Sequence, residues 1–270
     1  MDSAENFWDH VAMLGWQVEL GVDEATLDAP VNRYEIPAAA PKVETQPVEL
    51  PKAKATPPPA AAAPDPVALA NEAVNAARLA AQNATSIETL TETVNAFEHC
   101  ELKRGARSTL LGVGAASAPV MIIGEPPNRD EDREGRAFVG AAGQLLDRML
   151  AAIGRDRNAT DPETGVFVAS VMPWRPPNRD PNATELAMTM PFLERLVELV
   201  DPKIVILMGN VSCQAALGRN GITRLRGQWL TGFNRPVLPM FNPEFLLRTP
   251  AAKREAWHDL LMVKAKLNER

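Results

Sequence analysis

The amino-acid sequence predicts an α/β fold, a three-layer αβα sandwich with a central, mainly parallel four-stranded sheet. Two observations predict it. Four short apolar runs, typical of buried strands, lie at residues 120–123, 166–171, 204–208 and 237–240. Helical patterns alternate with these runs at residues 143–153, 184–200, 211–217 and 251–267. Such alternation is typical of a parallel sheet that helices cover on both faces.

Several elements carry local signals of their own. Residues 66–106 are rich in Ala, Asn and Leu at helical spacing, which predicts two further helices that pack on the sheet domain. The helix at 184–200 begins with a predicted capping box, in which Glu185 follows Asn182 at the required spacing. Trp257 and Leu260 lie at helical spacing in the last helix, so we expect both to be core residues.

The chain divides into three predicted segments before any motif is considered. Residues 1–34 form an N-terminal helical segment, because the stretch 3–20 has a helical stripe of apolar side chains. Residues 35–66 form a disordered Pro/Ala-rich linker, since nine Pro and nine Ala fall between Pro37 and Pro66. Residues 67–270 form the α/β domain. The helix at 3–20 either docks on its own domain or binds a protein partner.

Composition excludes several classes of protein. The chain has two Cys and three scattered His, which predicts neither a disulfide framework nor a His-rich metal site. No apolar run reaches membrane-spanning length and no signal peptide is evident, so we expect a cytoplasmic monomer without membrane contact. Residues 101–270 carry 23 Lys and Arg against 19 Asp and Glu, a balance compatible with a phosphate-rich partner.

The loops after the predicted strands carry the chemically informative residues, because ligands bind beyond the carboxyl ends of parallel strands. Glu125 lies in a Gly-Pro turn after the first strand, and Phe138 lies among glycines that favour a pocket wall. A rigid Pro-rich loop with Arg175 and Arg179 follows the second strand. A functional carboxylate is a better explanation of Glu125 than a solvated turn residue.

Four ordered motifs in these loops resemble those of the family 4 uracil-DNA glycosylases, especially the subgroup with a Pro-rich N-terminal extension. Residues 124–150 match the form GEAPGxxEDxxGxPFVGxAGxLLxxML at most positions, and residues 170–181 correspond to NVVxxRPPxNRxP. The tripeptide LRG occupies 225–227, and residues 242–257 follow HPxxLLRxPxxKRxxW. The resemblance covers about residues 98–267.

The resemblance implies hydrolysis of the N-glycosidic bond of uracil or another deaminated base in DNA, by a monofunctional glycosylase that flips the base into a pocket. Carried over by position, the catalytic residues are Glu125 and Asn242. Base-binding residues are Gly124, Asn128, Phe138 and Ser170. DNA-binding residues are Arg175, Arg179, Arg226, Leu246, Leu247, Arg248 and Lys253, with the leucine loop pressing into the minor groove.

This chain departs from the family pattern where the chemistry is expected. Ser170 stands for an Asn that reads the uracil edge, and Asn242 stands for a His that donates to the leaving group. Asn128 replaces a Gly and Pro126 replaces an Ala. The alternative is therefore a catalytically impaired paralogue that binds DNA or a repair partner.

The resemblance also implies an iron–sulfur cluster with four cysteine ligands. Only Cys100 falls at a ligand position, while Phe97, Trp174 and Thr189 occupy the other three. From the sequence we therefore expect no cluster and no other cofactor.

Overall fold

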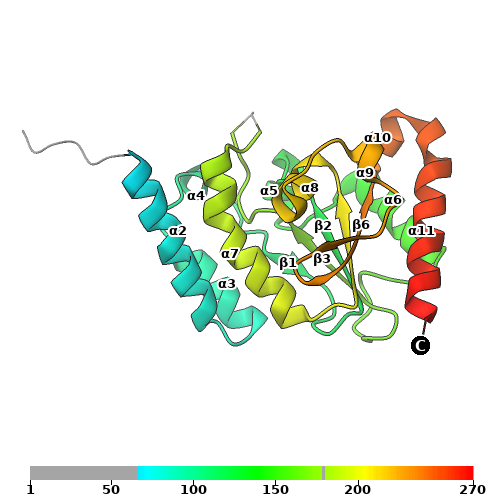
Figure 1. The fold of residues 1–270 in the computed structure, drawn as a ribbon, viewed down its shortest axis with the longest axis horizontal. Helices are drawn as coiled ribbons and strands as arrows, with labels where there is room; N and C mark the ends of the chain where they lie inside the picture. Colours follow the sequence, from blue (N-terminus) through cyan, green and yellow to red (C-terminus); the bar gives the residue numbers. More distant parts are fainter. Residues whose placement is uncertain (1–65, 178–179, 270) are drawn as a thin grey trace, which may run out of the picture. The chain divides into compact units, whose positions relative to one another are not determined.

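A six-stranded sheet forms the centre of the computed structural model, which describes residues 66–177 and 180–269 (Figure 1). The strand order is β1-β3-β2-β4-β6-β5. The strands are β1 (Gly112–Val113), β2 (Val120–Gly124), β3 (Val166–Ser170), β4 (Ile204–Met208), β5 (Leu230–Gly232) and β6 (Arg235–Met240).

The four central strands are the four that the sequence predicts, and they are parallel. Ile123 of β2 pairs with Ala169 of β3 and with Leu207 of β4, and Met208 of β4 pairs with Met240 of β6. The two edge strands are antiparallel and were missed. They are two and three residues long, too short to leave a periodic signal.

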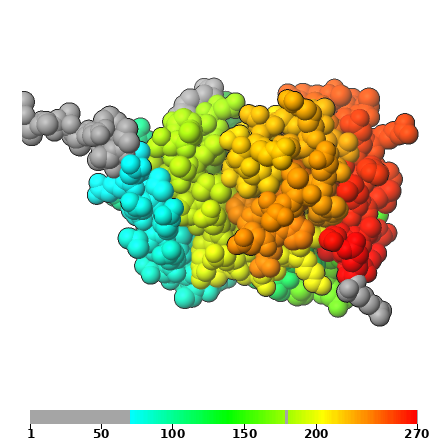
Figure 2. All heavy atoms as spheres, in the orientation of Figure 1, coloured from blue at the N-terminus to red at the C-terminus, as the bar shows by residue number. Residues whose placement is uncertain are grey.

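Alternate strand residues point to opposite faces, and each face has its own apolar core. Met121 and Ile123 join the cluster beneath α2 (Pro66–Asn83), α3 (Ile87–Ala96), α7 (Ala183–Val200) and α8 (Asn210–Leu217). Val120 and Ile122 join the cluster beneath α6 (Gly140–Ala151) and α11 (Lys253–Asn268). The three predicted layers are therefore confirmed. Figure 2 shows α7 and the segments up to β6, lime to orange, over the middle of one face.

The helices also follow their predicted positions, and α7 begins with the expected capping box. The Asn182 side chain accepts from the Glu185 N–H at 2.8 Å, and Glu185 Oε2 accepts from the Asn182 N–H at 2.8 Å. The short helices were not predicted: α4 (Leu102–Gly105), α5 (Arg129–Glu134), α9 (Ile222–Leu225), α10 (Pro243–Arg248) and the 3₁₀ turn η1 (Pro250–Ala252). Three of them, α5, α9 and α10, carry residues of the site.

One core prediction on α11 is wrong. Leu260 is fully buried as expected, but the Trp257 side chain is 44% exposed. The helix turns Ala256, Leu260 and Val263 toward the sheet, which leaves Trp257 on its flank.

The predicted N-terminal helix at 3–20 and all but the last residue of the predicted linker at 35–66 lie outside the described residues, so the domain boundaries stay predictions. Among the helices that the structure describes, none is both long and apolar enough to cross a membrane.

Candidate active site

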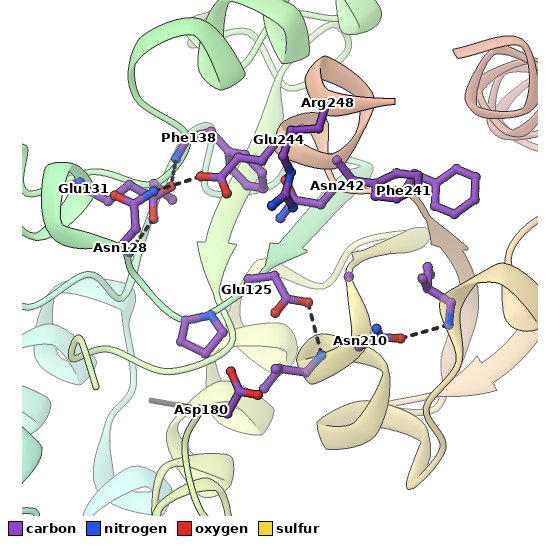
Figure 3. A pocket seen from close by; sticks show the side chains of 16 residues that line it. Glu125, Asn128, Glu131, Phe138, Asp180, Asn210, Phe241, Asn242, Glu244 and Arg248 are labelled. Carbon is purple, nitrogen blue, oxygen red and sulfur yellow. Dashed lines mark hydrogen bonds between the residues drawn. The ribbon is translucent and has the colours of Figure 1, made fainter. Parts of the chain in front are cut away.

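The carboxyl ends of β2, β4 and β6 open into a cavity of about 390 Å³ (Figure 3). The loop after β2 contributes Glu125, the loop after β4 contributes Gly209, and the loop after β6 contributes Asn242. These loops lie together because each follows the carboxyl end of a parallel strand, as the sequence predicts. Four carboxylates line the cavity, and Arg248 is the one cation among its described lining residues.

Glu125 lies between the cavity and the beginning of α8. Its Oε1 accepts a hydrogen bond from the Val211 N–H at 3.1 Å, at the helix N-terminus where backbone donors are unpaired. Burial raises the pKa of Glu125 to about 7, and the neighbouring carboxylates Asp180 and Glu244 add to the shift. Near neutral pH this carboxyl group can therefore both accept and release a proton, as a general base must.

Gly209 makes room for that carboxyl group. Its backbone has φ +120°, and a Cβ atom there would lie 1.7 Å from Glu125 Oε1. Only glycine satisfies both conditions. Gly209 and the Val211 amide were not predicted from the sequence. Their position directly after β4, where ligand-binding loops are expected, could have indicated them.

Asn242 is the N-cap of α10, and this role fixes its orientation. Its Oδ1 accepts from the Glu244 N–H at 2.9 Å. Because the cap requires the carbonyl oxygen, the Nδ2 amino group is the donor that Asn242 offers to the cavity it lines.

Phe138 is held in a rare backbone conformation on the cavity wall. It has φ +54° and is buried. Its N–H donates to Glu131 Oε1 at 2.6 Å, and Arg157 Nη1 donates to its carbonyl oxygen at 3.0 Å. The ring packs against Gly124, where a Cβ would come within 2.7 Å of it. Gly124 thus permits the position of Phe138.

Asn128 closes one side of the cavity by joining two short helices. Its Oδ1 caps α5 by accepting from the Asp130 and Glu131 N–H groups, and its Nδ2 donates to Glu244 Oε1 at 2.9 Å. Both ends of this amide are therefore engaged within the protein, in contrast to the predicted base contact.

Ser170 does not line the cavity, which corrects the prediction that it contacts the base. Its Oγ donates to the backbone carbonyl of Glu125 at 2.7 Å, and the side chain is buried. Ser170 therefore stabilises the backbone of the turn that carries Glu125, on the side away from the cavity.

The predicted DNA-binding residues separate into two groups. Leu247, Arg248 and Lys253 are exposed, and Figure 3 shows Arg248 reaching from α10 toward the cavity. Leu246 is only 1% exposed, so its prediction as a minor-groove wedge is wrong. The short helix α10 turns Leu246 into the core and Leu247 outward. Arg179 lies outside the described residues.

Two predicted phosphate contacts are instead internal ion pairs. Arg226 Nε donates to the buried Asp259 carboxylate at 2.9 Å, and Nη2 donates to the Glu255 carbonyl at 2.9 Å. Arg175 pairs at 3.3 Å with the buried Asp132. Both predictions are corrected, since each guanidinium compensates a buried charge.

Several positioning residues were missed altogether. Glu131 and Arg157 hold Phe138, and Arg157 is fixed in turn by Asp147 at 2.6 Å. Glu244 ties α10 to Asn128. These contacts join positions far apart in the chain, and no local pattern predicts them.

Proteins named type-4 uracil-DNA glycosylase are among the curated relatives of the chain. The one from Sulfurisphaera tokodaii is 32% identical over 190 residues, which cover 66% of this chain and 84% of the relative. The one from Pyrobaculum aerophilum is 32% identical over 186 residues, covering 65% and 92%. The one from Thermotoga maritima is 32% identical over 168 residues, covering 60% and 83%.

This kinship contradicts the prediction of a protein without a cofactor, because the resemblance implies an iron–sulfur cluster for the type-4 enzymes. The residues at the corresponding positions offer one buried thiol, Cys100. Phe97 stacks on Trp174 with ring centroids 6.4 Å apart, and Thr189 Oγ1 donates to the Glu185 carbonyl. These side chains do not supply four thiolates. The reaction proposed below uses the cavity residues alone.

The family model for the uracil-DNA glycosylase superfamily matches residues 111–261. This range contains all six described strands, the Glu125 turn and the Asn242 cap. The relatives named above support the same family. The chain belongs to the uracil-DNA glycosylase superfamily.

Proposed function

We propose that the chain is a DNA glycosylase that hydrolyses the N-glycosidic bond of uracil or another deaminated base. The observation that carries this proposal is the buried Glu125 carboxyl, with a pKa of about 7, in a cavity toward which Asn242 offers a donor. The name of the relatives, uracil-DNA glycosylase, supports the same reaction.

In the proposed reaction, the flipped base enters the cavity beside Phe138. Glu125 orients a water molecule and accepts its proton as the oxygen attacks C1′ of the sugar. The C1′–N bond breaks and the base departs with the electron pair. Asn242 Nδ2 donates a hydrogen bond to the negative charge that develops on the base, which stabilises the transition state.

The expected product is an abasic site with an intact strand. A glycosylase that also cleaves the strand uses an amine nucleophile to form a Schiff base. No lysine is among the described residues that line the cavity. This lining supports a monofunctional enzyme.

The alternative is a catalytically impaired paralogue that binds DNA or a repair partner. Ser170 and Asn242 favour it, because the first bonds to the Glu125 carbonyl and the second uses its oxygen as a helix cap. Under this alternative, Glu125→Gln leaves the cellular role intact. Loss of that role in the variant rejects the alternative.

Base release from oligonucleotides that carry one uracil or one hypoxanthine tests the proposal. Single-stranded and duplex forms are incubated with the wild type and with Asn242→His, and abasic sites are read as alkali-labile cleavage. Release by the wild type supports a glycosylase that works without the histidine. If the wild type releases no base and Asn242→His does, the result contradicts the proposal and favours the impaired paralogue.

A further prediction concerns Gly209. We expect Gly209→Ala to lower uracil release by at least about tenfold, because the added Cβ displaces the Glu125 carboxyl. Gly218→Ala is the matched control: it also places Ala at positive φ, at +63°, but no atom lies within 4 Å of the added Cβ. Both variants are compared by thermal unfolding and release rate. Equal release rates would contradict a Glu125 position that depends on Gly209.

A further inference from the structure

A second, apolar groove lies outside the active-site cavity, between α6 and α11. It has a volume of about 220 Å³. Leu145, Met149 and Leu260 form apolar walls, and Leu246 connects the groove with α10. Two cations, Arg148 and Lys253, stand among its lining residues, and no carboxylate does among the described residues. The groove is therefore apolar inside and positive at its edge.

Trp257 is the prominent exposed side chain of this groove. It is 44% exposed and follows Lys253 by one helical turn on α11. A Trp side chain that contributes only to core packing is mostly buried. Trp257 instead exposes its ring to solvent on a groove that two cations line. The same combination is what proteins use to bind single-stranded nucleic acid, since bases stack on aromatic rings and cations meet the phosphates.

The short helix α10 contributes residues to both the groove and the active-site cavity. Leu246 lines the groove, and Arg248, at the end of the same short helix, lines the cavity. Lys253 begins α11 directly after the η1 turn that follows. Figure 1 shows α10 beside the first turns of α11. A strand whose flipped base occupies the cavity can thus follow Arg248 and Lys253 to Trp257.

We propose that Trp257 is a stacking platform for an unpaired base that flanks the flipped nucleotide, with Arg148 and Lys253 facing the adjacent phosphates. This inference rests on the proposed function, because it takes DNA as the ligand. Positive charge at the edge, and a further exposed cation, Arg248, on the adjoining helix α10, favour DNA over an uncharged apolar peptide. The platform acts on single-stranded DNA, since bases of a closed duplex are already stacked on one another.

Binding of a labelled oligonucleotide tests the platform. The probe is a single strand of about 12 nucleotides without uracil, alone or paired with its complement. We expect Trp257→Ala to weaken single-strand binding about fivefold or more and duplex binding less than about twofold. Trp257→Phe should retain most of the affinity. Leu261→Ala is the matched control, because Leu261 is similarly exposed on α11 but does not line the groove.

The outcomes separate this inference from the proposed function. Equal single-strand affinity of wild type and Trp257→Ala overturns the platform and leaves a protein partner as the occupant. An equal loss in Leu261→Ala also overturns it, since a general effect on α11 would then be responsible. Uracil release by the wild type, measured on a uracil-bearing strand, tests the glycosylase proposal independently.

Discussion

The variant Glu125→Gln is expected to release uracil about 10²–10⁴ times more slowly than the wild type, the usual contribution of a positioned general base. Gln keeps the size of the side chain and an oxygen that accepts from the Val211 N–H. It cannot take a proton from water. Single-turnover release on a uracil-bearing strand measures the effect, with the exposed Glu92→Gln as a control that should not change the rate.

The rate of uracil release should depend on pH in a direction that the raised pKa of Glu125 determines. Burial raises the pKa of Glu125 to about 7, so the base is protonated and inactive below that pH. The wild-type release rate should therefore rise with pH through about 7 and then level off. Glu125→Gln should show no such step. A wild-type rate that does not change between pH 5.5 and 8.5 would assign the proton transfer to another group.

The same variant should be more stable than the wild type at high pH. The pKa of Glu125 is higher in the folded protein than the ordinary glutamate value of 4.5, so stability falls as pH rises from about 4.5 to about 7. Removing the titratable group should raise the free energy of unfolding at pH 8 by up to about 3 kcal/mol, with little change below pH 4.5. Urea unfolding at both pH values measures this difference. A less stable variant at pH 8 would contradict the desolvation of Glu125.

The sequence predicts the centre of the fold well, because each central strand is a continuous apolar run that is buried on both faces. Glu125, Phe138 and Asn242 were predicted from motifs, and they all line the cavity. The edge strands β1 and β5 were missed because two or three residues carry no period. A local sequence pattern therefore predicts a strand well where the residues along that strand are uniformly buried.

The wrong site predictions share a physical cause, the dependence of a side chain on distant partners. Arg226 looks like a phosphate ligand in sequence, yet the carboxylate that it compensates lies 33 positions away at Asp259. Arg175 finds its partner 43 positions away at Asp132. Leu246 was expected at the surface from the family resemblance, whereas the six-residue helix α10, which leaves little periodic signal in the sequence, buries it. Such pairings and short helices are decided by tertiary packing.

The variant Asn242→Asp is expected to lower uracil release by about 10²–10³-fold with little loss of stability. Asp is as good an N-cap as Asn, so it continues to accept from the Glu244 N–H and keeps α10 in place. It has no amino group to donate to the departing base, and its charge opposes the charge that develops there. Unfolding and single-turnover release separate the two roles of the amide.

Asn242→Ser provides the neutral counterpart of that variant. Its hydroxyl oxygen can cap α10, but the shorter side chain does not bring a donor as far into the cavity. If Asn242 acts as the leaving-group donor, both variants lose release while remaining folded, and Asn242→His regains it because imidazole donates from a similar reach. Full release by Asn242→Asp would show that the amide acts only as a cap, and that another group stabilises the departing base.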